Sequence, residues 1–323
     1  MLKIAITGTG SLVGQAIIKS IKKSHLADNI VLFGFDYFQN TVGTYWCNRN
    51  ELLPDIFNVE NVSKWKDCLI KYLSDFQIQI LFVGVDFELP YFSRFKAEME
   101  AATNCIICVS NTDVINIAND KYLTYEFLKA NNLNYPRTCL PRYFNDSGIS
   151  FPLILKPRVG ARSRDVYVIK NNQELSEKLI LVNEPIIQEL VGDVTTEYTC
   201  GVIFFDDKVK ASIALNRTLK EGNTNKCSFN TNTSDIIYEY INSVAFCLKP
   251  FGACNLQLRI DKDGLPKIFE INPRHSGTTY MRALFGFNEV EYIINYLVLN
   301  KETKFNLKQG EVIRFYDEFY IEK

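Results

Sequence analysis

Apolar runs of strand length alternate with helical periodicity over roughly the first third of the 323-residue chain. The apolar runs lie at 3–7, 30–35, 78–85 and 105–109, and helical patterns lie at 11–24 and 62–76. Strands that are buried on both faces read as continuous apolar runs, and helices between them return the chain to the same sheet. The alternation therefore predicts an α/β fold with a doubly wound parallel sheet, in a domain bounded at 1–112.

Beyond residue 112 strands follow one another at short intervals and helices become fewer. We expect a helix from Asn119 to about Asn131, strands at 152–157, 165–169, 186–190, 196–205 and 311–316, turns at 206–207 and 261–264, and helices at 235–248 and 289–299. Strand pairs joined by Asp- and Gly-containing turns are typical of antiparallel hairpins. The pattern predicts an α+β region with two further domains, at 113–187 and 188–323.

The composition excludes several classes of protein. The net charge of -1 does not fit a general nucleic-acid or membrane-surface binder, and no 18-residue apolar run is available to span a membrane. Nine cysteines are scattered singly, so we expect no disulfide framework and a cytoplasmic location. The sequence has two histidines, which excludes a histidine-rich metal site.

A glycine-containing turn follows the first apolar run. Gly8, Gly10 and Gly14 precede a helical pattern, and Asp36 ends the next apolar run. This arrangement is compatible with a dinucleotide-binding turn, in which backbone N–H groups face a phosphate and the acid holds a ribose. However, three residues separate the last two glycines, where the dinucleotide motif has two. The alternative interpretation is a tight strand-to-helix turn with no ligand.

A basic loop follows the apolar run that ends at Lys156. Arg158, Arg162 and Arg164 surround Gly160, so four cations lie within nine residues. Such a cluster suits a polyphosphate, which lysine and arginine side chains can neutralise. A solvated basic loop is the alternative, but the apolar run favours partial burial of Lys156.

Residues 253–274 read as two strands around an Asp-Gly turn. Glu270 and Asn272 lie two residues apart and therefore point to the same face, and a loop over 262–265 places Gln257 opposite Glu270. These oxygen-bearing side chains suit Mg²⁺, which takes few protein ligands together with phosphate oxygens. Arg274 follows at the strand end, where it can hold a phosphoryl group. The alternative is a solvated face of the hairpin.

Together these segments resemble the ATP-grasp superfamily, especially the relatives of the large subunit of carbamoyl phosphate synthase. Phe-Glu-Ile-Asn-Pro-Arg at 269–274 resembles the metal-ligand strand of that family, and Leu-Lys-Pro-Arg-Val-Gly-Ala-Arg-Ser at 155–163 resembles its phosphate-covering loop. Ile-Ile-Gln-Glu-Leu-Val-Gly at 186–192 resembles the hinge strand that meets the adenine, and 216–222 a segment that lines the reaction centre. The resemblance covers nearly the whole chain.

The resemblance implies a role for each motif residue. Gln257, Glu270 and Asn272 would hold the metal; Lys121, Lys156, Arg158, Gly160 and Ser163 the ATP phosphates; Gln188, Glu189 and Leu190 the adenine; Glu197 the ribose; and Arg217 and Arg274 the reacting carboxylate or acyl phosphate. The implied cofactors are ATP and Mg²⁺, with Mn²⁺ as a substitute. The implied reaction is amide formation between a small-molecule carboxylate and an amine through an acyl phosphate.

The substrate and the assembly are left open by the sequence. An amino acid, a peptide or a sugar acid of surface polysaccharides fits the resemblance, with Tyr45, Asp86, Glu88, His275 and Arg282 as candidate lining residues, and a homodimer is one possible assembly. The chain carries neither a glutaminase domain nor a second ATP-grasp half, so we do not expect a carbamoyl phosphate synthase. The competing functions are a nucleotide-binding protein without catalysis and an NAD-dependent enzyme.

Overall fold

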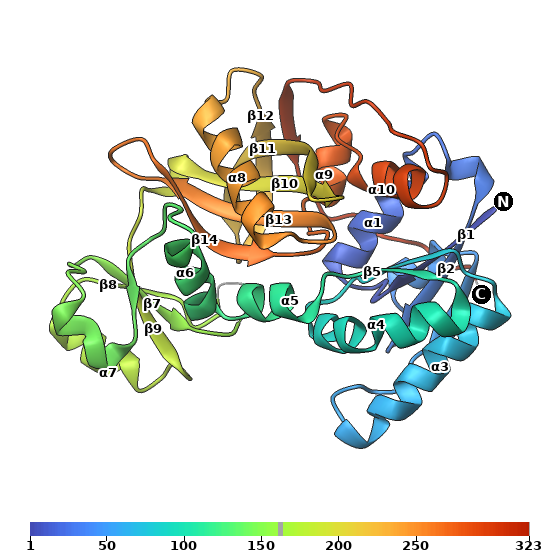
Figure 1. The fold of residues 1–323 in the computed structure, drawn as a ribbon, viewed down its shortest axis with the longest axis horizontal. Helices are drawn as coiled ribbons and strands as arrows, with labels where there is room; N and C mark the ends of the chain where they lie inside the picture. The colour runs from blue at the N-terminus through green and yellow to red at the C-terminus, as the bar shows by residue number, and fades with distance from the viewer. Residues whose placement is uncertain (161–163, 323) are drawn as a thin grey trace. The chain divides into compact units, whose positions relative to one another are not determined.

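The computed structural model describes residues 1–160 and 164–322, which fall into two compact units (Figure 1). Unit 1 comprises 1–112, 250–253 and 273–323, and unit 2 comprises 113–249 and 254–272. The three-domain division at 112 and 187 remains a prediction. Residues 161–163, which include the predicted Arg162 and Ser163, lie outside the part of the chain that the structure describes.

Unit 1 contains a parallel sheet in the order β3-β2-β1-β4-β5. Its strands are β1 (Leu2–Thr7), β2 (Ile30–Asp36), β3 (Arg49–Leu52), β4 (Ile80–Phe82) and β5 (Ile106–Cys108). The central strands form where apolar runs were expected, and Ile4, Ala5 and Ile6 of β1 are fully buried. This sheet confirms the predicted α/β fold class. The polar edge strand β3 carries no apolar run and was not predicted.

Helices complete unit 1 from two distant parts of the sequence. The first part supplies α1 (Leu12–Lys22), α2 (Val42–Tyr45), α3 (Val62–Asp75) and α4 (Leu89–Thr103), with short 3-10 turns at Ala27–Asn29, Val59–Asn61 and Asp86–Glu88. The last part supplies α9 (Thr279–Leu284), α10 (Glu289–Leu297) and the short strand β15 (Gly310–Ile313). Helix α1 packs against both α9 and α10, so the final segment of the chain belongs to the same core as the first.

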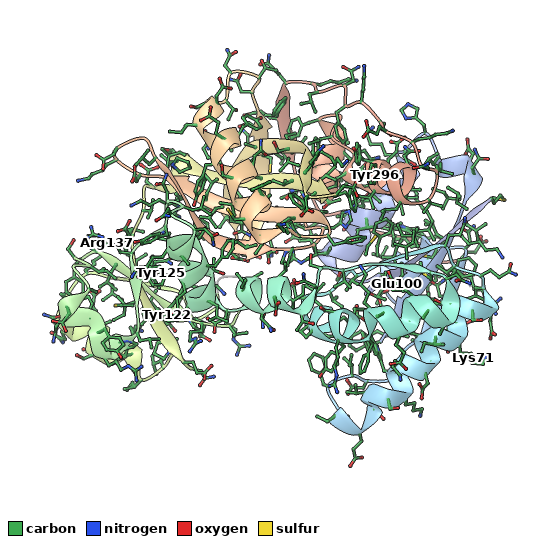
Figure 2. All side chains as sticks on the ribbon, viewed as in Figure 1. Lys71, Glu100, Tyr122, Tyr125, Arg137 and Tyr296 are labelled. Carbon is green, nitrogen blue, oxygen red and sulfur yellow. The ribbon has the colours of Figure 1, made fainter. Side chains whose placement is uncertain are left out.

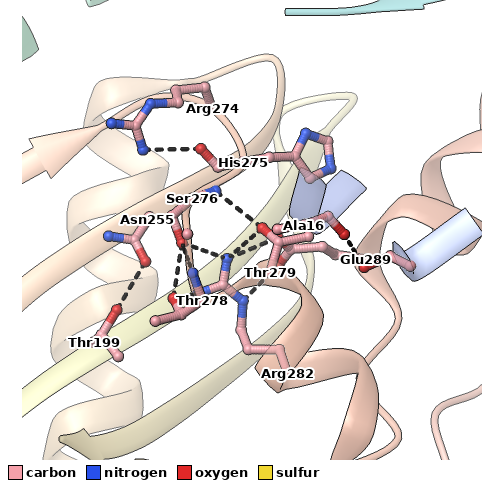
Figure 3. A network of polar contacts seen from close by, with 12 residues as sticks. Ala16, Thr199, Asn255, Arg274, His275, Ser276, Thr278, Thr279, Arg282 and Glu289 are labelled. Carbon is pink, nitrogen blue, oxygen red and sulfur yellow. Dashed lines mark hydrogen bonds and ion pairs between the residues drawn. The ribbon is translucent and has the colours of Figure 1, made fainter. Parts of the chain in front are cut away.

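A buried polar network holds the segment around α9 together (Figure 3). Arg282 and Glu289 are both fully buried, and their side chains form an ion pair at 2.7 Å. Thr278 accepts a hydrogen bond from Arg282 at 2.8 Å, and Ser276 accepts another at 3.2 Å. A buried charge is tolerated only when it is paired and hydrogen-bonded, and this network meets both conditions.

Unit 2 contains two antiparallel sheets. The smaller sheet has the order β6-β9-β7-β8, from β6 (Thr138–Cys139), β7 (Leu153–Pro157), β8 (Tyr167–Ile169) and β9 (Pro185–Glu189), with α7 (Asn172–Leu179) and a 3-10 segment at Pro141–Asp146. Leu153 and Leu155 of β7 and Ile187 of β9 lie in its apolar core. The helices α5 (Thr112–Asn119) and α6 (Lys121–Ala130) precede this sheet in the sequence.

The larger sheet carries the hairpin that the sequence singles out. Within unit 2 its strand order is β14-β13-β10-β11-β12. The strands are β10 (Glu197–Phe205), β11 (Lys208–Lys220), β12 (Asn223–Phe229), β13 (Gly252–Ile260) and β14 (Pro266–Asn272), and a 3-10 turn at Val194–Thr196 leads into β10. Helix α8 (Asp235–Leu248) packs on β10 and β11 (Figure 1). One apolar face of this sheet is therefore covered, and the opposite face is available for polar side chains.

Candidate nucleotide-binding site

The hairpin β13–β14 has the pairing that was predicted for it. Gln257 lies opposite Glu270, and Asn255 lies opposite Asn272. The register shifts between Gln257 and Leu258, so a β-bulge adjusts the pairing between the turn and these residues. The turn consequently spans one residue more than expected, while the predicted opposition of Gln257 and Glu270 is confirmed.

A pocket of about 210 Å³ lies entirely within unit 2. It brings together most of the predicted site residues: Lys121, Lys156, Gly160, Gln188, Glu189, Leu190, Glu197, Arg217, Gln257 and Glu270. It is also lined by Arg164 and Arg259 and by apolar side chains such as Ile154, Leu219 and Phe269. A concave site with an apolar lining and a few converging polar groups is typical of a small-molecule site.

Lys156 occupies the end of β7, where the apolar run was expected to bury it. Its side chain is 5% exposed, and its ammonium group donates to Oε1 of Gln188 at 2.8 Å. The carboxamide of Gln188 in turn donates to Thr138 at 2.9 Å, which fixes its orientation. Burial lowers the pKa of Lys156 to about 7, and the nearby charge of Lys121 contributes to the shift. An anion in the pocket would favour the charged form.

Lys121 and Arg158 lie beside the basic loop, but they differ in their exposure to the pocket. The ammonium group of Lys121 donates to the carbonyl of Gly160 at 2.9 Å, which ties α6 to the loop. Arg158 instead pairs with Asp120, whose carboxylate accepts from its Nε at 2.9 Å. Asp120 also caps α6 by accepting from the backbone N–H groups of its first turn. Arg158 is therefore engaged in a structural ion pair and is not among the residues that line the pocket.

The hinge segment after β9 is held by an ion-pair cluster. Glu189 accepts from Arg137 (labelled in Figure 2) at 2.9 Å and from Lys267 at 2.5 Å. Burial alone would raise the pKa of Glu189, but the hydrogen bonds from Lys267 and Arg137 outweigh it and lower the pKa below its ordinary value. Because its side chain is held in this way, the backbone groups of the hinge remain the natural contacts for a ligand.

Glu197, at the start of β10, is buried between two arginines. Its Oε1 accepts from Nε of Arg217 at 2.9 Å, and its Oε2 accepts from Nε of Arg259 at 2.9 Å. Arg217 also donates to Oε1 of Gln257 at 2.7 Å. The predicted ribose residue, one predicted catalytic residue and one predicted metal ligand therefore share a single hydrogen-bonded network.

The oxygen donors of the hairpin fit a divalent cation that also binds phosphate. Asn272 donates to Oε1 of Glu270 at 3.0 Å, so the two side chains lie on one face as expected. Among residues 1–160 and 164–322, no group of three or more His, Cys, Asp or Glu side chains is placed to hold a metal. A metal at Gln257, Glu270 and Asn272 would have one carboxylate and two amide ligands, which suits Mg²⁺ bound together with a polyphosphate.

Arg274 lies in unit 1 and is not among the residues that line this pocket. Its Nε donates to Asp86 at 2.6 Å, and its Nη1 donates to the carbonyl of His275 at 2.8 Å. Of the candidate substrate residues, Glu88, His275 and Arg282 are buried within unit 1, whereas Tyr45 is exposed. Glu88 accepts from Tyr37 at 2.7 Å and from Thr7, and burial raises its pKa to about 8.

The glycine turn of unit 1 is occupied by the chain itself. Asp36 accepts from the backbone N–H of Gly10 and from that of Tyr37, each at 2.7 Å. A side chain at Gly14 would lie 2.2 Å from the carbonyl oxygen of Gly8, and a side chain at Gly10 would lie 2.6 Å from Thr41. The glycines permit these close approaches, which favours the interpretation as a tight turn over that as an NAD site.

Three charged residues of the site carry no signal that singled them out in the sequence. Arg259 lines the pocket from β13, whereas Arg137 and Lys267 act through Glu189. Arg259 lies two residues after Gln257 on the same strand, so it shares a face with a predicted ligand. That spacing was the one sequence feature that pointed to Arg259 as a site residue. Polar alternation alone does not distinguish a pocket residue from one on a solvated face of the strand.

The fold is that of the ATP-grasp enzymes. Residues 193–316 match the model of a family described as ATP-grasp in the biosynthetic pathway with Ter operon. The structure is similar to that of an N5-carboxyaminoimidazole ribonucleotide synthetase solved with ADP, with a TM-score of 0.75 and 13% identity over 95% of this chain and 80% of that one. It is also similar to L-amino acid ligase from Bacillus licheniformis, with a TM-score of 0.71 and 16% identity over 92% of this chain and 74% of that one.

Two curated relatives extend the comparison. Tetrahydromethanopterin:alpha-L-glutamate ligase of Methanocaldococcus jannaschii is 23% identical over 227 residues, which are 58% of this chain and 76% of that protein. An uncharacterized protein of Mycoplasma genitalium is 32% identical over 97 residues, 30% of this chain and 33% of its own length. Together the comparisons confirm the predicted fold class and the ATP-grasp resemblance: the chain has the fold of the ATP-grasp enzymes, and residues 193–316 match an ATP-grasp family model.

Proposed function

We propose that the protein is a Mg²⁺- and ATP-dependent ligase that joins a small-molecule carboxylate to an amine through an acyl phosphate. One observation carries the proposal: a single pocket collects the buried Lys156, the hinge residues Glu189 and Leu190, and the side chains of Gln257 and Glu270 from the β13–β14 hairpin. A site that binds ATP as a phosphoryl donor requires a cation for the phosphates, a surface for the adenine and oxygen ligands for the metal, and we assign these three parts to this pocket.

We assign the roles by the groups that each residue presents. Lys121, Lys156 and the backbone of Gly160 bind the ATP phosphates, whereas Arg158 stays in its ion pair with Asp120. Gln188, Glu189 and Leu190 lie on the adenine side and Glu197 on the ribose side. Gln257, Glu270 and Asn272 would hold Mg²⁺, or Mn²⁺ in its place, which when bound offsets the charge of the phosphates.

The reaction consists of two displacements. A carboxylate oxygen of the substrate attacks the γ-phosphorus of ATP, and the bond to the bridging oxygen breaks to release ADP. The amine nitrogen then attacks the acyl carbon, inorganic phosphate leaves, and the nitrogen loses a proton. In our proposal Arg217, which lines the pocket, stabilises the negative charge that develops on the acyl phosphate. The protein supplies positioning and charge neutralisation, which account for most of the catalysis in phosphoryl transfer.

We propose an amino acid as the amine substrate. Two of the similar proteins are named for ligations that involve an L-amino acid or α-L-glutamate. For the carboxylate substrate, a sugar acid is one candidate. We propose a reducing, cytoplasmic location on the ground that the nine cysteines are scattered singly along the sequence. None of the helices of residues 1–160 and 164–322 is long and apolar enough to cross a membrane.

ADP release measured over paired carboxylates and amines tests the proposed function. We expect at least one pair, with an amino acid, ammonia or glutamine as the amine, to stimulate ADP release, and Glu270→Ala to abolish the stimulation. Asp263→Ala, which removes an exposed carboxylate from the turn of the same hairpin, serves as the matched control. ATP binding without ADP release over the whole panel would instead support a non-catalytic nucleotide-binding protein.

A further inference from the structure

The carboxylate of Glu197 is fully occupied by two guanidinium groups. Its Oε1 accepts from Nε of Arg217 at 2.9 Å and forms an ion pair with Nη2 of the same side chain at 2.7 Å. Its Oε2 accepts from Nε of Arg259 at 2.9 Å and forms an ion pair with Nη2 of the same side chain at 2.8 Å. The Glu197 side chain is 5% exposed, and Glu197, Arg217 and Arg259 all line the pocket.

This occupancy limits what Glu197 can offer a ligand. An ionised carboxylate has about four lone-pair positions and no donor. Two hydrogen bonds and two close ion-pair contacts from the arginines surround the Glu197 carboxylate, and hydrogen bonds between charged groups are among the strongest in proteins. A ribose hydroxyl that donated to Glu197 would have to displace one of them.

Arg259 offers what Glu197 lacks. Its guanidinium carries five N–H donors. Among the described residues, two donors are engaged by Glu197, and a third reaches the carbonyl of Val191 at 3.4 Å. Two N–H donors therefore remain on a side chain that lines the pocket and is 21% exposed.

The position of these donors indicates which part of a nucleotide they meet. Val191 directly follows Glu189 and Leu190, the hinge residues on the adenine side of the pocket. Arg259 contacts Val191 on one side and Glu197 on the other, so its guanidinium lies between the hinge and the start of β10. The phosphate-side cations Lys121 and Lys156 instead come from α6 and β7. The part of a nucleotide next to the adenine is the ribose.

We propose that Arg259 binds the nucleotide by donating hydrogen bonds to the ribose hydroxyl oxygens, and that Glu197 is a positioning residue that holds the guanidinium of Arg259. The inference rests on the proposed function, which supplies ATP as the ligand. The resemblance implies that the ribose hydroxyls donate hydrogen bonds to the carboxylate of Glu197. In this proposal the ribose hydroxyl oxygens instead accept hydrogen bonds from the guanidinium of Arg259.

The preference for ATP over 2′-deoxy-ATP and 3′-deoxy-ATP tests the proposal. The dissociation constant of each nucleotide is measured with Mg²⁺ by calorimetry. We expect the wild-type chain to bind ATP about tenfold more tightly than at least one deoxy analogue, as befits a hydrogen bond from a charged donor. Arg259→Met should weaken ATP binding about tenfold and leave the deoxy analogue nearly unchanged, so that the preference disappears.

Two further variants separate recognition from stability. Arg259→Lys keeps a cation beside Glu197 but removes the spare N–H pair, so it should fold like the wild type and still lose most of the preference. Lys262→Met removes an exposed cation from the turn of the same hairpin and should keep the wild-type preference. Thermal unfolding of each variant identifies any loss of affinity that follows from misfolding.

The outcomes that overturn the proposal are distinct. If folded Arg259 variants keep the wild-type preference, Arg259 does not read the ribose. If Arg259→Met keeps the preference and Glu197→Gln loses it, Glu197 contacts the ribose itself. A wild-type chain that binds no ATP refutes this inference and the proposed function together, whereas ATP binding without any ligation refutes the proposed function alone.

Discussion

Lys156 and Gln188 form a buried hydrogen bond of 2.8 Å in which a cation meets a neutral carboxamide. Because no charge is supplied by that partner, burial lowers the pKa of Lys156 to about 7. A bound polyphosphate would raise this pKa again, so ATP binding above pH 7 should take up a proton. Calorimetry at pH 8 in buffers of different ionisation enthalpy should report an uptake approaching about one proton. Its absence from the wild type would contradict the assignment, and Lys156→Met should abolish it.

Replacement of the single carboxylate in the proposed metal-binding group should change the metal requirement. Glu270 is the one charged donor beside Gln257 and Asn272, so Glu270→Gln removes most of the attraction for a divalent cation. We expect the half-saturating Mg²⁺ concentration for ADP release to rise at least about tenfold. Asp263→Asn, at the exposed turn, is the control and should leave the Mg²⁺ dependence intact. Equal Mg²⁺ curves for Glu270→Gln and the wild type would place the metal elsewhere.

The ion pair between Arg282 and Glu289 should dominate the stability of its segment. Both side chains are fully buried, so Arg282→Met leaves an uncompensated charge and should lower the free energy of unfolding by about 3–5 kcal/mol. Urea unfolding at pH 7 measures the loss. The double substitution Arg282→Met with Glu289→Leu should be less damaging than the sum of the two single changes. Lys71 (labelled in Figure 2) forms an exposed ion pair with Asp75, and Lys71→Met should leave the unfolding midpoint essentially unchanged.

The buried carboxyl of Glu88 should make unit 1 less stable as the pH rises. Its pKa is raised from 4.5 to about 8, so between these values the folded state holds a proton that the unfolded state has lost. The free energy of unfolding should therefore fall through this window and level off above about pH 8. Glu88→Gln should remove this slope and be more stable than the wild type at pH 8 in chemical denaturation. Parallel stability curves for both proteins would contradict the raised pKa.

The sequence predicted the elements that have strong apolar patterns. The buried strands of unit 1 and the hairpin of 253–274 follow directly from period and turn chemistry, and the pairing of Gln257 with Glu270 follows from the turn position. The strand Arg49–Leu52 was missed because it is an edge strand with polar residues and one apolar position. The bulge after Gln257 was missed as well. The alternation of polar and apolar residues along a strand does not indicate a one-residue shift in its pairing with the neighbouring strand, and the pair Gln257–Glu270 is the same with or without the bulge.

The candidate site was predicted unevenly. Lys156 stood out because an apolar run implied its burial, and the pocket contains it. Arg158 has the same charge and lies two residues further on, but its partner Asp120 comes from a distant part of the sequence, which no local pattern indicates. The role of Arg259 likewise depends on Glu197, sixty-two positions away along the chain. Ion pairs between distant residues are set by the tertiary fold, and a single sequence carries no record of them.

The order of the two units along the chain has a consequence for synthesis. Unit 2 is nearly contiguous in the sequence, whereas unit 1 is built mainly from 1–112 and 273–323. Unit 2 is therefore inserted within the sequence of unit 1. As the chain emerges from the ribosome, the strands β1 to β5 are complete long before α9 and α10, which pack on α1, have been made. The entropic cost of bringing two segments together is smaller when the chain between them is already compact, because the effective loop is shorter. Folding of the inserted unit therefore brings the two parts of unit 1 within reach of each other, and a variant that delays the insert should leave α1 exposed to proteolysis during synthesis.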